Sequence, residues 1–292
     1  MSTDNPNYPK LEEYRNNLQK LYKQNMDGLK YEEIYNLYFD AAIVLQILGG
    51  YFVSEKTNGR QLYRVRASSQ INELEDLSLI QTYSYPPTNI CKNNGRGNIK
   101  HKSVFYCADS AVAAVKESNI KENEQCYISV WELQAKRDLN YTSYLPVNLP
   151  ENNYWEKIGY LHHNYMLNLN DRNLNYQLEL RKFITSKFMF EEFPYPISSL
   201  IANENLYYGD HKSDLIIYPS AKTMSDYVNY AFHPNVVNEH LKLKKVFNCK
   251  ITKFYEDYIQ FGVAEVGRLE NNRIIWSEPT DEDRIYFNAD EA

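Results

Sequence analysis

Two arginines, Arg64 and Arg66, stand in a strand-like segment of the chain, QLYRVRA at 61–67. Because side chains alternate along a strand, both guanidinium groups belong to one face, with Tyr63 and Val65 on the other. A guanidinium offers five donors in a planar fork, a shape that suits a phosphate or a carboxylate. Two such charges do not fit an apolar core. The segment therefore predicts either a solvent-exposed strand face or a cleft that binds an anion.

A second arginine-containing motif, GRGN at 95–98, lies in a polar stretch that we expect to be a long loop, 84–103. Glycines on both sides of Arg96 would let the backbone approach a ligand closely. The same glycines are equally typical of a flexible turn. The residues alone thus leave open whether Arg96 and Asn98 contact a substrate.

Glu117 closes an alanine-rich run, AVAAVKE, that predicts a helix with Asp109 or Ser110 as its N-cap. The apolar stripe of this helix is formed by Ala111, Val112 and Val115. By the 3.6-residue period, Glu117 falls roughly opposite that stripe. The periodicity therefore favours a solvated carboxylate at the end of the helix.

Ser220 directly follows the apolar segment LIIYP at 215–219, which predicts a short buried strand ended by Pro219. A serine in this place is commonly a turn residue, although its hydroxyl could equally hold a ribose or phosphate oxygen. Tyr106 lies within another strand-like segment, VFYCA at 104–108. An aromatic residue there belongs to the core in most folds, and its ring could also stack on a planar base.

The hydrophobic pattern indicates the elements that must position these residues. Apolar residues recur at intervals of three and four over 10–24 and 31–48, which predicts two helices, the second stopped by Gly49 and Gly50. A third helix is expected over 174–190, and strands are expected over 61–67, 104–108, 126–133, 215–219 and, as a terminal meander, 242–278. This order predicts an α+β protein. We expect residues 1–50 to form a helical extension packed on a main domain of 51–292.

The composition of the chain argues against two classes of protein, those that bind nucleic acid over an extended surface and those that span a membrane. The 292 residues carry a formal charge of −6, and the pI is near 5.6. This balance argues against an extended nucleic-acid footprint, which needs clustered Lys and Arg. The longest apolar run, AAIVLQIL at 41–48, is too short to span a bilayer, and the N-terminus lacks a signal-peptide pattern. We therefore expect a cytoplasmic protein without a membrane partner.

The cysteines and histidines do not predict a metal site. Cys91, Cys107, Cys126 and Cys249 are widely spaced, with no CxxC pair. Buried reduced thiols are the expectation for Cys107 and Cys126, which lie among strand-like apolar residues. His162 and His163 are adjacent, which points two imidazoles in different directions on most backbones.

Taken in chain order, four segments resemble the RES domain, a family named for its Arg, Glu and Ser. These segments are LYRVR at 62–66, GRGN at 95–98, VFYCADSAVAAVKE at 104–117, and IIYPS at 216–220 followed by NYAF at 229–232. The resemblance covers roughly residues 45–250. The chain departs from the family in a long stretch between Glu117 and Ser220 and in an extended C-terminal tail.

The resemblance implies catalytic roles for Arg64, Glu117 and Ser220. Arg64 would anchor a pyrophosphate, Glu117 would stabilise positive charge on a ribose, and Ser220 would position the ribose side. Arg66 is the second candidate for the family arginine. Further contacts to the substrate are implied for Arg96, Asn98, Tyr106 and Asn229, with the Tyr106 ring on the nicotinamide base.

The resemblance also implies a fold and a reaction. The fold would be like that of ADP-ribosyltransferases, a split, mixed β core with helices that grips NAD in a cleft. NAD would be the substrate and no further cofactor would be needed. The enzyme would cleave the nicotinamide–ribose bond, with water or inorganic phosphate as the acceptor. Family members commonly act as toxins held in check by an antitoxin protein.

Two alternatives from other classes stay open. One is an ADP-ribosyltransferase that modifies a macromolecule at the same site, and the other is a catalytically silent interaction module. The joint presence of Arg64, Glu117 and Ser220 argues against the silent module. The sequence does not decide between a monomer and a homo-oligomer.

Overall fold

The computed structural model describes residues 9–42, 49–52, 54–146, 148–151, 153–157, 174–208, 212–255 and 258–287. Its helices are α1 (Leu11–Lys23), α2 (Tyr31–Ala41), α3 (Ser54–Thr57), α4 (Ala111–Glu117), α6 (Leu174–Phe190), α7 (Pro196–Asn203), α8 (Pro234–His240) and α9 (Asp281–Ile285). Its strands are β1 (Gly49–Phe52), β2 (Gln61–Ala67), β3 (Phe105–Ala108), β4 (Gln125–Leu133), β5 (Leu139–Ser143), β6 (Leu215–Pro219), β7 (Val228–Phe232), β8 (Leu241–Phe254), β9 (Ile259–Glu270) and β10 (Arg273–Ser277). The strands predicted over 61–67, 104–108, 126–133 and 215–219 and the helix predicted over 174–190 are confirmed.

The described strands form one mixed sheet in the order β1-β5-β6-β7-β3-β2-β4-β8-β9-β10. The pairs are antiparallel except for β5 and β6, which run parallel. The predicted C-terminal meander is present as β8, β9 and β10, which pair in sequence. The protein is therefore an α+β protein built on a large, mostly antiparallel sheet.

The sheet opens between β2 and β3. Along all of Gln61–Ala67, β2 pairs with β4, whereas its described register with β3 consists of Tyr63 opposite Ala108. β3 pairs on its other side with β7 over its whole length. In the described register, β2 and β3 are thus paired at Tyr63 and Ala108, and they diverge at the positions of Arg64 and Arg66.

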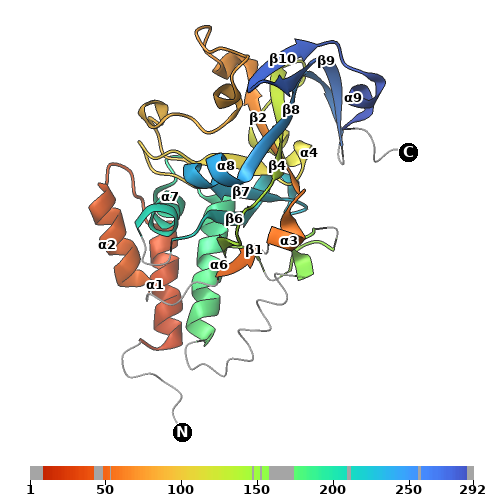
Figure 1. Cartoon of the computed structure of the whole chain (residues 1–292). Coiled ribbons are helices and arrows are strands. Elements are labelled where there is room, and N and C mark those ends of the chain that lie inside the picture. Colours follow the sequence, from red (N-terminus) through yellow and green to blue (C-terminus); the bar gives the residue numbers. More distant parts are fainter. Residues whose placement is uncertain are drawn as a thin grey trace.

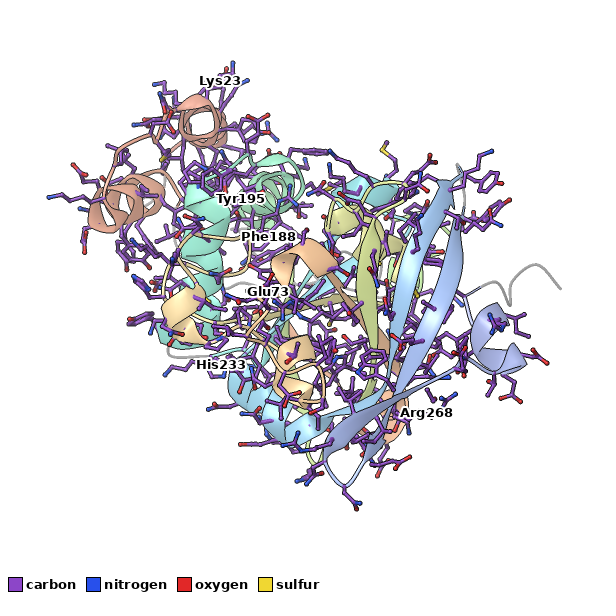
Figure 2. All side chains as sticks on the ribbon, turned by 90° about the horizontal axis from the view of Figure 1, so that it is seen from above. Lys23, Glu73, Phe188, Tyr195, His233 and Arg268 are labelled. Atoms are coloured by element: carbon purple, nitrogen blue, oxygen red, sulfur yellow. The ribbon has the colours of Figure 1, made fainter. Side chains whose placement is uncertain are left out.

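A helical layer covers one part of the sheet (Figure 1). Helices α1, α2, α6 and α7 share an apolar cluster with residues of β6, among them Ile216 and Tyr218. Figure 2 shows this layer, which includes Lys23 of α1, on the opposite side of the molecule from Arg268 of β9. The two predicted N-terminal helices therefore pack on the rest of the chain rather than standing apart.

The second of these helices is shorter than predicted. It ends at Ala41, because Ala42 has extended backbone angles and its side chain is buried in the helical cluster. Leu45 and Leu48, which were expected on the same helix face, lie outside the described residues. Gly49 and Gly50 begin strand β1 instead of only stopping a helix. A Cβ at Gly50 would lie 2.6 Å from the Tyr141 hydroxyl oxygen, so glycine permits the pairing of β1 with β5.

None of the helices in the described part of the chain is both long and apolar enough to cross a membrane.

Candidate active site

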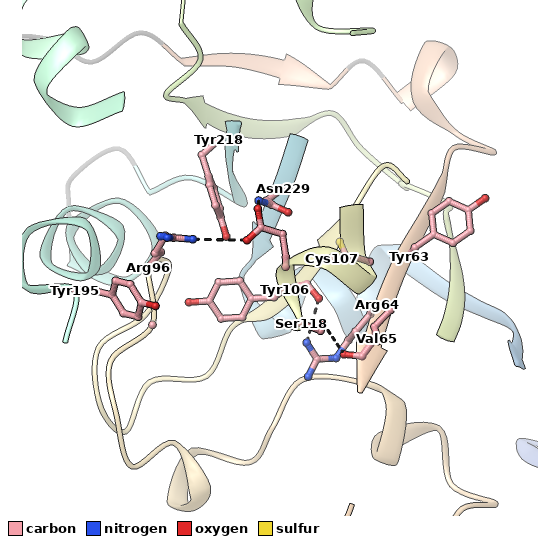
Figure 3. A pocket seen from close by; sticks show the side chains of 13 residues that line it. Tyr63, Arg64, Val65, Arg96, Tyr106, Cys107, Ser118, Tyr195, Tyr218 and Asn229 are labelled. Atoms are coloured by element: carbon pink, nitrogen blue, oxygen red, sulfur yellow. Dashed lines mark hydrogen bonds and ion pairs between the residues drawn. The ribbon is translucent and has the colours of Figure 1, made fainter. Parts of the chain in front are cut away.

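A pocket of about 280 Å³ lies where β2 and β3 separate (Figure 3). It is walled by these two strands, the C-terminal half of α4, the GRGN turn and single residues of β6, β7 and the segment before α7. Five of the eight candidate residues predicted from the sequence line it: Arg64, Arg96, Tyr106, Glu117 and Asn229. The other lining residues are Tyr63, Val65, Gly95, Cys107, Ala114, Ser118, Tyr195 and Tyr218.

Glu117 is the last residue of α4. The hydroxyl of Ser110 caps this helix by accepting a hydrogen bond from the Val112 amide at 3.2 Å, which selects Ser110 over Asp109 as the N-cap. The Glu117 side chain is only 17% exposed, so the solvated carboxylate that periodicity favoured is wrong. The periodicity of one helix cannot predict this burial, because β7 and the end of β6 cover this end of α4 and come from a distant part of the chain.

Both oxygens of the Glu117 carboxylate have partners. Oε1 accepts hydrogen bonds from the Ser220 hydroxyl at 2.7 Å and from the Asn229 side-chain amide at 3.1 Å. Oε2 lies 3.6 Å from Nη1 of Arg96. These contacts fix the carboxylate in position at the wall of the pocket. Three other candidates, two of them more than 100 residues away in sequence, thus converge on the Glu117 carboxylate.

Ser220 contacts Glu117 from the protein interior and not from inside the pocket. It is fully buried and is not among the lining residues. Its amide donates to the Tyr227 carbonyl at 2.9 Å, and its carbonyl accepts from the Ser225 amide at 2.9 Å. The turn that follows β6 therefore holds Ser220 firmly. Its hydroxyl orients the carboxylate, and a direct contact with a ribose is not available in this arrangement.

Arg64 is a half-buried cation on the opposite wall of the pocket from Arg96 (Figure 3). Its Nη1 donates to the Tyr106 carbonyl at 3.1 Å, while its Nε has no partner. Burial, and secondarily the charge of Arg66, lower the pKa of Arg64 to about 10, so the group stays charged at neutral pH. No carboxylate in the described part of the chain forms an ion pair with it. This uncompensated charge favours an anionic ligand.

Arg66 lies outside the pocket. Its Nη1 and Nη2 bind the Glu75 carboxylate at 2.7 and 3.0 Å, and they also donate to the carbonyls of Thr82 and Gln70. The two arginines that were expected on one strand face therefore have different roles. Arg66 fastens the segment 70–82 to β2, and Arg64 alone reaches the pocket.

The GRGN turn is held by Tyr106. The Tyr106 hydroxyl accepts from the Gly97 amide at 2.7 Å and donates to the Asn98 side-chain oxygen at 2.7 Å. A Cβ at Gly97 would lie 2.8 Å from the Cβ of Ala231, so the close approach to β7 requires glycine. The turn is thus pinned rather than flexible. Asn98 is buried and supports the turn, while the Arg96 side chain enters the pocket.

Tyr195 is a lining residue that the sequence analysis did not single out. The carbon at the centre of the Arg96 guanidinium lies 5.3 Å from the centroid of the Tyr195 ring, within the range of a cation–π contact. Tyr195 has φ 57° and ψ 51°, a left-handed conformation that is rare for an aromatic residue. Its place between Pro194 and Pro196 is the one sequence signal of a constrained turn here.

The candidate site is built from polar groups without a metal-binding cluster. No group of three or more His, Cys, Asp or Glu side chains suited to a metal occurs among the residues that the structure describes, and His162 and His163 lie outside them. All four cysteines are buried free thiols. Burial raises the pKa of the Cys107 thiol, which lines the pocket, well above its ordinary value. Cys107 is therefore a poor nucleophile at neutral pH.

Comparison with models of known protein families gives no match for this chain, and comparison with curated protein sequences gives none either. The chemistry of the candidate site is therefore inferred from the geometry of the pocket. An uncompensated guanidinium on one wall and an oriented carboxylate on another suit a ligand that carries an anionic group and develops positive charge nearby.

Proposed function

We propose that this protein consumes NAD by cleaving the bond between nicotinamide and its ribose, the reaction implied by the resemblance to the RES domain. The observation that carries the proposal is the Glu117 carboxylate, held on both oxygens by Ser220, Asn229 and Arg96 at the wall of the pocket. These three partners come from motifs that contribute to the resemblance. Their convergence on one carboxylate brings three of the four sequence segments together at one position.

In this proposal Arg64 binds the pyrophosphate of NAD. Its half-buried guanidinium lacks a carboxylate partner among the described residues, so a phosphate oxygen would supply the missing negative charge. Tyr106 and Tyr195 line the same pocket and offer aromatic faces for the nicotinamide ring. A cavity of about 280 Å³ suits the nicotinamide–ribose half of the dinucleotide.

The chemical step needs charge stabilisation more than acid catalysis. Nicotinamide leaves with the electron pair of the glycosidic bond and becomes neutral, while the ribose carbon becomes part of an oxocarbenium ion. Glu117 stabilises that cation, as carboxylates do in other glycosyl cleavages. An oxygen of the acceptor then attacks the same carbon; a water acceptor releases one proton to the solvent, and a phosphate acceptor attacks through a deprotonated oxygen. Ser220 and Asn229 act through Glu117 by holding it in place.

We further propose that the core is organised like that of ADP-ribosyltransferases, as a split, mixed sheet. The opening between β2 and β3 supports this proposal, because the pocket lies at that opening and its walls come from both sides.

The direct test is incubation of the purified chain with NAD, with and without inorganic phosphate and with a chelator in parallel, followed by chromatography of the products. We expect nicotinamide to be released without added metal. ADP-ribose as the second product identifies water as the acceptor, and a phosphorylated ADP-ribose identifies phosphate. Intact NAD after long incubation at high protein concentration contradicts the proposal. Labelled NAD that appears on protein or nucleic acid in a gel points instead to a macromolecular acceptor.

The resemblance extends the proposal to a toxin that is restrained by an antitoxin protein. Expression of the chain alone should then lower cellular NAD and stop growth, and expression of a Glu117→Gln variant should not. Normal growth with unchanged NAD at verified expression contradicts the toxin role.

A further inference from the structure

Helix α6 has one apolar face and one mixed face, which carries both apolar and polar side chains. One face packs into the helical layer through buried residues, including Leu180, Phe183, Ile184 and Phe188. The second face carries residues at helical spacing along a groove of about 420 Å³: Leu178, Arg181, Lys182, Thr185, Ser186 and Met189. Leu145 and Pro146, which follow β5, form the other side of the groove, and Phe190 stands at its end. This groove shares no lining residue with the candidate active site.

A cation without a counter-charge lies in this groove. Nε and Nη2 of Arg181 both donate to one acceptor, the Leu145 carbonyl, at 3.2 and 3.1 Å. Nη1 of Arg181 is buried and has no hydrogen-bond partner. In the described part of the chain, no carboxylate forms an ion pair with Arg181, and burial lowers its pKa. A buried guanidinium of this kind is normally paired with an anion.

Thr185 supplies a second unpartnered polar group beside Arg181. Thr185 is 6% exposed, and its hydroxyl oxygen has no partner. Thr185 lies four positions after Arg181, which places it one turn further along the same helix face. The two groups together offer N–H and O–H donors at one position in the groove.

From these observations we propose that the groove binds a small aliphatic carboxylate. The carboxylate would accept hydrogen bonds from Arg181 and Thr185, and the aliphatic chain would lie along the apolar lining toward Met189 and Phe190. One guanidinium balances one negative charge, which favours a carboxylate over a phosphate. The eight helical steps from Arg181 to Met189 span about 12 Å, enough for a chain of medium length. Both unpartnered atoms are shielded from water, so the proposal includes a small rotation of the two side chains toward the ligand.

Binding of octanoate to the full chain, measured by titration calorimetry, tests this proposal. Octanol, octylammonium and acetate are the matched probes, since they remove the charge, reverse it or remove the chain. We expect saturable binding of octanoate at one site per chain and at least about tenfold weaker binding of each of the other three. Equal binding of octanol and octanoate would show an apolar groove without a carboxylate site. That result, or a lack of saturation with octanoate, overturns the proposal.

Two variants locate the site. Thr185→Val keeps the shape of the side chain and removes the hydroxyl, and we expect octanoate to bind about 3- to 10-fold more weakly. Arg181→Met removes the charge, with an expected loss of about 10- to 100-fold. Lys182→Met is the control, because Lys182 lines the same groove but is exposed and paired with Glu179. Unchanged affinity in folded Thr185→Val, or an equal loss in Lys182→Met, contradicts the assignment. Thr185→Val keeps this test decisive if Arg181→Met does not fold.

Discussion

At the scale of single residues, the candidate site depends on how one carboxylate is held. Glu117 receives hydrogen bonds on Oε1 from Ser220 and Asn229, and Arg96 lies near Oε2. A carboxylate with both oxygens engaged has little freedom to rotate. Such preorganisation lets a charged group stabilise a transition state without first reorganising.

Replacing Glu117 with Gln tests this charge directly. Gln keeps the size and nearly all the helix propensity of Glu, and its amide oxygen can still accept from Ser220. We expect NAD turnover to fall about a hundredfold or more, with NAD affinity much less affected, because the charge matters most once the bond begins to break. Kinetics, binding and melting temperature should be measured on the same sample. Glu13→Gln, at an exposed position of α1, is the control. Near-normal turnover in folded Glu117→Gln would remove this residue from the mechanism.

The two arginines of β2 should respond differently to removal. Arg64→Ala removes the pocket guanidinium, and we expect NAD affinity to fall about ten- to a hundredfold or more. Arg66→Ala removes the ion pair with Glu75 and two bonds to carbonyls. We expect this variant to lose about 1–3 kcal/mol of stability while its folded fraction binds NAD within about threefold of the wild type. Titration of both proteins with NAD, alongside denaturant unfolding, separates the two roles. A loss of affinity confined to Arg66→Ala would show that the wrong arginine has been assigned to the pocket.

At the scale of elements, short connections rather than the strands themselves present several of the pocket side chains. The GRGN turn presents Arg96, and the segment between α6 and α7 presents Tyr195. Phe188 of α6 lies 5.2 Å, ring to ring, from Tyr218, another pocket residue. Helix α6 and its C-terminal connection therefore support one side of the candidate site.

Tyr195 allows the effects of ring and backbone to be separated. Tyr195→Ala and Tyr195→Gly both remove the ring, so both should bind NAD about 3- to 10-fold more weakly. Only Gly relieves the left-handed backbone at φ 57°, so Tyr195→Gly should be about 1 kcal/mol more stable than Tyr195→Ala. Affinity and denaturant unfolding of the pair test this prediction. Wild-type affinity in both variants would exclude the ring from the binding site, and equal stability would contradict the backbone argument.

At the scale of the whole molecule, the site requires strands from distant parts of the chain to meet. Asp109 lies at one such junction, between β3 and α4. Its carboxylate accepts from the Val228 amide at 3.0 Å, and its own amide donates to the Val228 carbonyl. Burial raises the pKa of Asp109 to about 6 from an ordinary value of 3.8. The ionised form of Asp109 therefore destabilises the folded state at neutral pH.

This pKa shift predicts how the stability of an Asp109→Asn variant depends on pH. The folded-state pKa is above the unfolded-state value, so the charged carboxylate destabilises the wild type above about pH 6, and this penalty fades as the pH falls through the window from 6 to 3.8. Asn is always neutral and can still accept from the Val228 amide. We expect the variant to be more stable than the wild type by up to about 3 kcal/mol near pH 8, and by less than half of that gain near pH 4.5.

Denaturant unfolding at both pH values measures this difference. Asp27→Asn, at an exposed position, should show no such dependence and serves as the control. A gain that does not depend on pH, or a variant that is less stable than the wild type near pH 8, contradicts the prediction.

The sequence by itself determined most of the elements and the identity of the candidate residues. Alternation in QLYRVRA defines β2, the continuous apolar segment LIIYP defines β6, and the alanine-rich run ending at Glu117 defines α4. These are local patterns, in which each residue's preference depends on near neighbours in the chain. The four motifs identified Arg64, Arg96, Glu117 and Ser220 as candidates for the same reason, because each motif is a short stretch of consecutive residues.

Only the tertiary structure decided what surrounds each of these side chains. Periodicity left Glu117 in solvent, yet β7 and the turn after β6 enclose it. Alternation placed Arg64 and Arg66 on one face, yet Glu75 takes up Arg66 and leaves Arg64 alone at the pocket. Tyr195 carried no motif, and it lines the pocket because α6 and α7 pack on the sheet. Burial and charge pairing depend on contacts between segments far apart in the chain, and no local pattern contains that information.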